Sequence, residues 1–150
     1  MAGTTVTIAV DDAAVRALFG RLAAFGAAPT RATLVDIGEY MLRSTRERTD
    51  REESPDGVPW VGLSKKYERR KQRLRPGVRM LHFDNFMLGA RLSYQVGTDY
   101  VDIGTSAKYG ATHQFGRDGI PARPWLGASA ADLAELRQIL AAHLQAALDG

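Results

Sequence analysis

The spacing of apolar residues predicts three long helices in this chain. Apolar side chains recur every three or four positions over residues 12–26, 30–48 and 129–148, which is typical of helices with one buried face. Thr30 and Ser129 are residue types that cap helix N-termini. The stripe of the last helix consists of Leu133, Leu136, Leu140, Leu144 and Leu148. We expect the first two helices to form a helical hairpin.

Alternation of apolar and polar residues predicts strands in two places. Residues 5–10 alternate and are rich in β-branched side chains, which favours a strand at an edge of the sheet or facing a partner. The clearest β signal is a hairpin that pairs residues 92–96 with residues 100–104 across a turn at residues 97–99. The apolar face of the first strand would carry Val6, Ile8 and Val10.

The remaining segments are short or lack a period. Residues 47–62 mix charges with Pro and Gly and are predicted to be an exposed loop. Ser64 can cap a helix over residues 65–73, and Asp84 or Asn85 can open another that ends near Leu92. A helical turn at 109–115 and an extended stretch at 117–127 precede the last helix. Together these elements predict one α+β domain over residues 1–150, with a small antiparallel sheet packed against helices.

The composition is that of one ordinary globular domain. The chain has 150 residues, of which 45% are hydrophobic and 25% are charged, and a chain of this length can bury a sufficient core. It has no cysteine, which excludes disulfides, thiolate zinc sites and a cysteine nucleophile within the chain. No window is long and apolar enough to span a bilayer, so we expect a soluble protein without a membrane partner.

The positive charge is concentrated in one segment. The net charge is only +3, but residues 65–79 carry eight Lys or Arg and one Glu. Such a segment can contact DNA phosphates, or it can be a solvated loop or pair with an acidic neighbouring subunit. We expect residues 47–79 to be mobile in the free chain and ordered on assembly. The candidates for a charged arm or a DNA-facing surface are Lys65, Lys66, Arg69, Arg70, Lys71 and Arg73.

No motif in the sequence indicates catalysis or cofactor binding. His82, His113 and His143 do not occur at the close spacings of metal ligands. The chain also lacks the glycine-rich phosphate loops and the nucleophile elbow of common enzyme families. We therefore expect no enzymatic activity, no cofactor and no metal.

Several residues are candidates for contacts between subunits. Trp60 and Trp125 lie beside prolines outside any periodic element, so each either folds back over the core or anchors a partner. Arg123 lies between two prolines that restrict its backbone, which suits bidentate binding to a neighbouring carboxylate or carbonyl. Ile8 and Val101 lie on strands whose edges can pair with a strand of another subunit.

Two strings in the second half of the chain resemble a known family. Residues 109–116 read Tyr-Gly-Ala-Thr-His-Gln-Phe-Gly, and residues 121–127 read Pro-Ala-Arg-Pro-Trp-Leu-Gly. With Pro59-Trp60-Val61-Gly62 before the basic helix, they resemble the phage virion morphogenesis, or tail completion, family of Mu-like and P2-like tailed phages. Asp84-Asn85 replaces a Thr-Gly that is frequent in that family, which changes only a cap or a turn.

The resemblance implies a structural protein of the virion that is similar to tail terminators. Such a protein assembles as a ring, a hexamer by family analogy, at the head-proximal end of the tail. The implied partners are other copies of the chain, the tail tube protein, the head connector or stopper, the sheath protein, and DNA passing through the lumen without sequence readout. It would occupy the host bacterial cytoplasm during assembly and then the neck of the virion. The alternative is a nucleic-acid-binding accessory protein that acts through residues 65–79.

Overall fold

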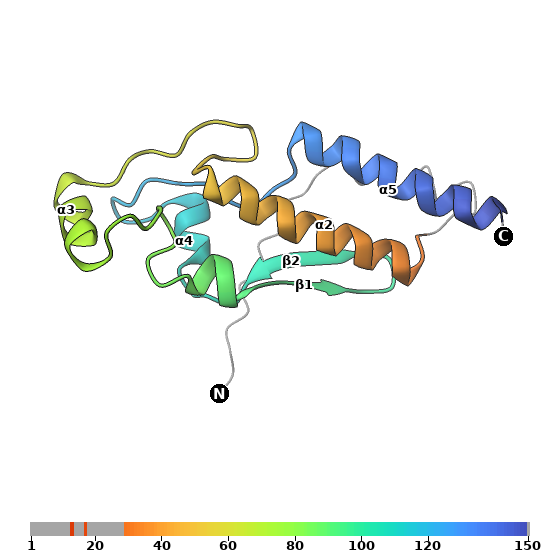
Figure 1. Cartoon of the computed structure of the whole chain (residues 1–150), viewed down its shortest axis with the longest axis horizontal. Helices are drawn as coiled ribbons and strands as arrows, with labels where there is room; N and C mark the ends of the chain where they lie inside the picture. The colour runs from red at the N-terminus through yellow and green to blue at the C-terminus, as the bar shows by residue number, and fades with distance from the viewer. Residues whose placement is uncertain (1–12, 14–16, 18–28, 150) are drawn as a thin grey trace.

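The computed structural model describes residues 29–149 and the single positions 13 and 17. A long helix, α2 (Arg31–Asp50), lies across an antiparallel hairpin of β1 (Leu92–Val96) and β2 (Val101–Thr105), and α5 (Ala130–Asp149) runs alongside α2 (Figure 1). This arrangement confirms the predicted α+β class, with a two-stranded sheet among the described residues.

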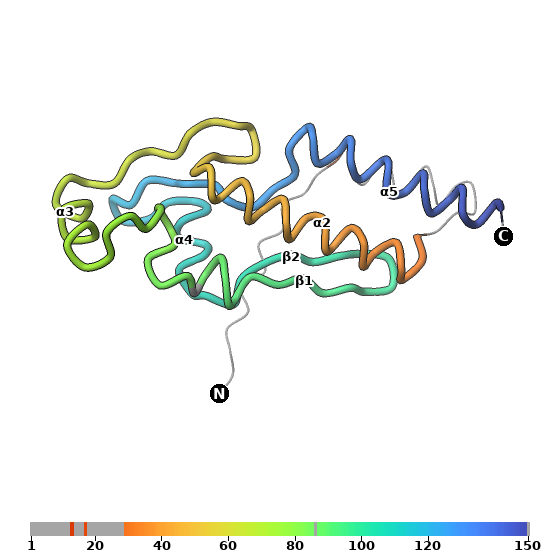
Figure 2. Tube along the Cα trace, viewed as in Figure 1, coloured from red at the N-terminus to blue at the C-terminus, as the bar shows by residue number. Residues whose placement is uncertain are grey.

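The shorter elements lie at one end of an elongated molecule. They are α3 (Lys65–Leu74), the π-helical turn η1 (Phe86–Ala90) and α4 (Gly110–Phe115). The hairpin turn, the first residues of α2 and the end of α5 lie at the opposite end (Figure 1). The trace in Figure 2 also places the segment after α2 beside the segment that leads into α5. The two ends therefore carry different parts of the sequence.

Side-chain caps fix where the helices begin. The Thr30 hydroxyl accepts a hydrogen bond from the amide of Thr33, and the Ser64 hydroxyl accepts one from the amide of Tyr67. At the start of α5, Ser129 Oγ accepts from the Asp132 amide at 3.0 Å, while Asp132 Oδ2 accepts from the Ser129 amide at 2.8 Å. This reciprocal pair is a capping box. The predicted caps at Thr30, Ser64 and Ser129 are thus confirmed.

Two apolar clusters hold these elements together. The first lies beneath the loops and contains Trp60, Met87, Leu88, Leu92, Ala107, Trp125 and Leu126. The second joins α2 to α5 through Ile37, Met41, Leu136 and Leu140, with Val101 and Ile103 of β2 packed against it. Because both faces of α2 are used, that helix is the central support of the described chain.

The hairpin forms as predicted, with β2 beginning one residue later than expected. Leu92 pairs with Thr105 and Val96 with Val101, and the Gly97 amide donates to the Tyr100 carbonyl across the turn at 2.8 Å. Tyr94 faces α2, where its hydroxyl donates to Glu39 Oε1 at 2.7 Å. Its ring occupies the space into which a Cβ on Gly38 would project. The hairpin and α2 can approach this closely because position 38 is glycine.

Three expectations from the sequence need correction. The second helix does not end near Arg48 but continues to Asp50, because Arg48 and Thr49 are buried. The helix expected from Asp84 to Leu92 is a single π-turn, closed by a bond from the Ala90 amide to the Asn85 carbonyl at 3.2 Å. The leucine stripe of α5 is buried at Leu136 and Leu140, but Leu148 at its end is 73% exposed.

Two expectations lie outside the described residues. These are the strand at 5–10, which contains Ile8, and the helix at 12–26 apart from the single positions 13 and 17. The mobility expected for residues 47–79 stays a prediction.

Candidate assembly surface

Both tryptophans are buried in the described chain. Trp125 has no exposed surface and Trp60 is 7% exposed. The Trp60 indole Nε1 donates to the Pro124 carbonyl at 2.7 Å, and the Trp125 indole Nε1 donates to the Gly110 carbonyl at 3.0 Å. Both indoles belong to the first apolar cluster, and each bonds to a carbonyl of another segment of the chain. Of the two alternatives, the structure favours folding back over the core.

Arg123 binds carbonyl groups of its own chain. It is 4% exposed, and its guanidinium donates from Nε to the Val61 carbonyl at 2.7 Å and from Nη2 to the Gly62 carbonyl at 2.8 Å. The predicted bidentate geometry is present, but within one chain. Burial lowers the pKa of Arg123, and these bonds offset part of the cost of burying its charge. Arg123 thus fastens the segment after Trp60 to the segment before Trp125.

Gln114 on α4 organises the same region. Its side-chain oxygen accepts hydrogen bonds from the amides of Trp125 and Leu126, each at 3.0 Å, and its Nε2 donates to the Leu126 carbonyl at 3.0 Å. One buried amide thereby replaces three backbone partners that a sheet would supply. At least one residue of the string at 109–116, Gln114, therefore has a structural role in holding the loop at Trp125.

A buried ion pair locks α2 to α5. Arg48 Nη2 lies 2.5 Å from Asp132 Oδ2, and both side chains are almost fully buried. Arg48 Nη1 also donates to the carbonyls of Gly127 and Trp125. Asp132 further accepts from the hydroxyls of Ser44 and of Tyr40, the latter at 2.9 Å. Arg48 therefore connects the α5 capping box to the loop that holds Trp125.

The protonation of this cluster follows from its partners. Burial, together with the hydrogen bond to Asp132, raises the pKa of Tyr40 to about 12. Burial alone would raise the pKa of Asp132, but the hydrogen bonds from Ser44, Ser129 and Tyr40 outweigh it and lower that pKa. The Asp132 carboxylate and the Arg48 guanidinium are therefore both charged at neutral pH, as the paired geometry requires.

Sequence reasoning missed Arg48, Asp132 and Gln114. The sequence does not single out Arg48, and Gln114 stands there only within the string at 109–116, because charged and amide side chains are usually exposed. The available signal was Ser129-x-x-Asp132, the spacing of a capping box. It fixes the position of Asp132 at the start of α5, although it does not reveal the Arg48 partner.

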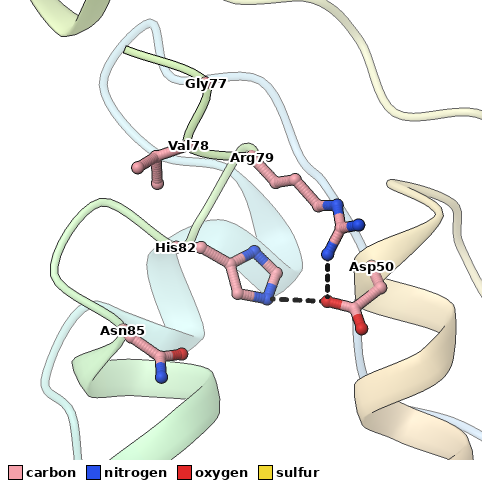
Figure 3. Close-up of a pocket in the computed structure, with 6 residues that line it drawn as sticks. All are labelled: Asp50, Gly77, Val78, Arg79, His82 and Asn85. Carbon is pink, nitrogen blue, oxygen red and sulfur yellow. Dashed lines mark ion pairs between the residues drawn. The ribbon is translucent and has the colours of Figure 1, made fainter. Parts of the chain in front are cut away.

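A polar hollow of about 500 Å³ opens beside the end of α2 (Figure 3). Asp50 lies between Arg79, at 3.0 Å from Nη1, and His82, at 3.6 Å from Nε2. The other lining residues are Gly77, Val78 and Asn85. Arg79 and His82 both face this carboxylate, so these contacts hold together the two ends of the segment between residues 50 and 82.

The basic helix α3 presents most of its cations to solvent. Lys65, Lys66, Arg69, Arg70 and Arg73 are exposed, and none of them has an ion-pair partner among the described residues. Lys71 is the exception, because it is only 6% exposed. Lys71 is therefore removed from the expected charged surface.

The strand candidates have different positions. Val101 is partly buried against the cluster between α2 and α5, so its side chain faces the core and not a partner. The outer face of the hairpin carries Ser93, Gln95 and Asp102, all exposed. Ile8 lies outside the described residues.

Searches for two other kinds of site were negative over the described part of the chain. Among residues 29–149 no group of three or more His, Asp or Glu side chains is arranged to hold a metal ion. Within the same residues no helix is both long enough and apolar enough to cross a membrane.

Comparison with known proteins gives two matches. The model of the phage virion morphogenesis family matches residues 10–145. The curated protein named Mu-like prophage FluMu G protein 1, from Haemophilus influenzae, is 31% identical over 102 residues, which cover 67% of this chain and 70% of that protein. No solved structure matches the chain.

Proposed function

This chain belongs to the phage virion morphogenesis family, and from that premise we propose that it forms a ring at the head-proximal end of a phage tail. The ring ends growth of the tail tube and offers a surface for joining the head. The family assignment over residues 10–145 is the observation that carries the proposal. By analogy with tail terminators, the ring is a hexamer.

The described residues support a structural and non-enzymatic role. The polar side chains of the interior, Arg48, Gln114, Arg123 and Asp132, bond to backbone groups or to one another. These contacts fix the positions of loops and helices, and a subunit of an assembly needs such a fixed frame.

The proposed partners follow from this position in the particle. Copies of the chain contact one another in the ring, the tail tube protein contacts one side, and the head connector or stopper contacts the other. A sheath protein is a further neighbour, and genomic DNA passes through the lumen without sequence readout. The neck is then the location in the finished virion, after assembly in the host cytoplasm.

A second candidate function is nucleic-acid binding by an accessory protein. The exposed, unpaired cations of α3 favour it, because Lys and Arg side chains neutralise phosphates. Measuring the affinity of the chain for DNA at increasing salt concentrations separates the two candidate functions. An affinity that rests on several phosphates falls steeply with salt. The role in tail assembly does not require such an affinity.

The proposed function is tested by deleting the gene from the phage or prophage. Without a cap, tube polymerisation continues, so tails of excessive and irregular length should accumulate beside filled heads that lack tails. Electron microscopy of lysates measures tail length and the fraction of heads with tails. Supplying the wild-type chain from a plasmid should restore both.

To test the hairpin as a contact surface, the chain supplied from the plasmid should carry Asp102→Lys. Val101→Lys is unsuitable for this test. Asp102 is exposed on the outer face of β2, so its replacement leaves the core intact, whereas Val101 packs against the cluster between α2 and α5. Knockout particles with tails of normal length, normally joined to heads, would reject both the capping and the joining role.

A further inference from the structure

We propose that copies of this chain associate head to tail, with the basic end around α3 of one copy binding the acidic end around the hairpin turn of the next. This proposal rests on the proposed ring and names the surfaces that form it. The basic end comprises α3 with its flanking loops, and the acidic end comprises residues 29–39, 96–102 and 143–149. Figure 1 shows these two regions at opposite ends of the molecule.

The basic end combines unpaired charge with exposed apolar side chains. Residues 65–79 hold eight cations and one carboxylate, and the exposed cations of α3 lack ion-pair partners among the described residues. Tyr67 and Leu74 on α3 are 44% and 53% exposed. Val61, Phe115 and Ile120 are also exposed. The bond from Arg123 to the Val61 carbonyl connects the loop after α4 to the segment that precedes α3. Exposed apolar side chains with a rim of charge are typical of protein interfaces.

The acidic end has the opposite charge on three elements. Within residues 29–39, 96–102 and 143–149 there are five carboxylates and one guanidinium, that of Arg31. The carboxylates are all exposed, and they belong to Asp36, Glu39, Asp99, Asp102 and Asp149.

Local contacts hold two of these carboxylates, those of Asp36 and Glu39, in place. Asp36 bonds to His143 at 2.6 Å, and Glu39 bonds to Tyr94 at 2.7 Å, so α2, α5 and the hairpin form one surface. Tyr100 and Leu148 add exposed apolar area at 54% and 73%.

A second copy of the chain fits this pair of surfaces better than DNA does. Phosphate binding uses cations and gains nothing from exposed Phe115, Leu74 and Val61, whereas a protein partner covers both kinds of group. The acidic end supplies the matching charge and matching apolar residues on the same molecule. Opposite charges across an interface set its orientation and exclude wrong pairings.

The arrangement has a consequence for symmetry. The two surfaces are different and lie at opposite ends, so contact between them is heterologous, and repetition of a heterologous contact produces a closed ring or an open filament. An interface in which α3 meets α3 would bring six cations toward six cations and is disfavoured by charge. A head-to-tail contact is therefore the self-association that these charges permit.

The test reverses two charges at each end separately. The first variant carries Lys66→Glu with Arg70→Glu, which lie one turn apart on the exposed face of α3, and lowers the net charge of residues 65–79 from +7 to +3. The second carries Asp99→Lys with Asp102→Lys and brings the net charge of the acidic end from −4 to 0. Each variant alone should self-associate about tenfold or more less tightly than the wild type, since each loses most of the charge complementarity of the contact. Sedimentation velocity at matched concentrations measures this loss.

Mixing the two variants is the decisive step. In a 1:1 mixture the unaltered acidic end of the first variant can bind the unaltered basic end of the second, so a heterodimer can form through one wild-type contact. Association should therefore return in the mixture although it is lost in each variant alone. Rescue of this kind is specific to a heterologous contact between the two ends.

Controls separate charge reversal from misfolding. Arg137 is exposed on α5 away from both ends, so Arg137→Glu should assemble like the wild type. Circular dichroism should give all variants the melting behaviour of the folded wild-type chain.

Three results would overturn the inference. They are a wild-type chain that stays monomeric at low salt, reversed variants that assemble normally, and a mixture that remains dissociated. Loss of DNA retention by the α3 variant with unchanged self-association would assign α3 to DNA instead. The proposed function is judged separately, by tail length in knockout lysates, so either can fail without the other.

Discussion

Single polar residues carry much of the order in this protein. Arg123, Gln114 and Asp132 each connect segments that are distant in the sequence, and each is buried. A buried polar group is favourable only when its hydrogen bonds are made. Replacing one partner leaves the others unsatisfied, so these positions should be more sensitive than their polarity suggests.

Arg123→Ala should destabilise the isolated chain by about 1–3 kcal/mol. The change removes charge-assisted bonds to the carbonyls of Val61 and Gly62, and this cost falls on the monomer because both carbonyls belong to the same chain. Urea unfolding followed by tryptophan fluorescence measures it. Arg123→Lys should recover only part of the loss, because an ammonium cannot reproduce the fork of a guanidinium. An unchanged monomer with a lower yield of assembled particles would instead return Arg123 to an interface.

Asp132→Asn should cost about 3–5 kcal/mol at neutral pH, because it leaves the Arg48 guanidinium buried without its carboxylate. The pKa of Asp132 is lower in the folded chain than in the unfolded one, so the unfolded chain binds the proton more readily. The stabilisation is complete well above the ordinary value of 3.8 and is lost as pH falls through and below it.

Thermal melts across this pH range check the effect of Asp132. The difference in melting temperature between the wild type and Asp132→Asn should become smaller below about pH 4. Asp118→Asn is a matched control, because its ion pair with Arg117 is exposed and exposed pairs contribute little. A difference in melting temperature that does not change with pH would show that Asp132 stabilises the chain by packing and not by its charge.

At the scale of elements, the close contact between α2 and the hairpin depends on Gly38. Alanine favours a helix over glycine by about 1 kcal/mol, but a Cβ here would lie 2.4 Å from Cδ2 of the Tyr94 ring. We expect the clash to win and Gly38→Ala to destabilise the chain by about 1–3 kcal/mol.

The Tyr94→Leu background provides the control for Gly38, because removing the ring should make Gly38→Ala neutral or stabilising. Gly104→Ala, where a Cβ meets nothing within 4 Å, should be tolerated in either background. Thermal melts of the five variants, three single and two double, measure these differences. If Gly38→Ala lowers the stability equally with and without the Tyr94 ring, the proposed clash between this ring and a Cβ at position 38 is contradicted.

The segment between α2 and η1 divides into an anchored and an exposed part. Trp60 donates its amide to the Glu52 carbonyl at 2.8 Å, and the Met80 amide donates to Glu52 Oε1 at 2.7 Å. The intervening α3 has ten residues, with only Lys71 buried, and so short a helix is marginal without packing. In the isolated chain, hydrogen exchange should therefore be slow at Trp60 and fast through α3, and α3 should become protected on assembly. Strong protection of α3 in the monomer would contradict this.

The sequence predicted most elements correctly, and the errors have a common cause. Helices α2 and α5 were found because each has a one-sided apolar pattern and a capping residue, and the hairpin because its strands alternate. The end of α2 was missed because Arg48 behaves as a core residue once Asp132 neutralises it. The sequence left two positions open for Trp60 and Trp125, over the core or at a partner, because their loops have no period and only tertiary contacts bury them.

At the scale of the whole molecule, family membership and surface charge bear on the same question. The family makes the chain a component of virion assembly. The proposed ring then requires two different surfaces, and the described chain has ends of opposite charge. The basic end is visible in the sequence as the charge of residues 65–79. The acidic end is not, because it combines residues from α2, the hairpin and α5.

The most direct measurement is the position and copy number of this protein in the wild-type particle, by electron cryomicroscopy of the neck with a tagged chain. The account predicts a single closed ring, six copies by analogy, between the tail tube and the head connector, with α3 of each copy against the hairpin turn of the next. Copies distributed along the tube, at the distal end of the tail or inside the head would contradict it.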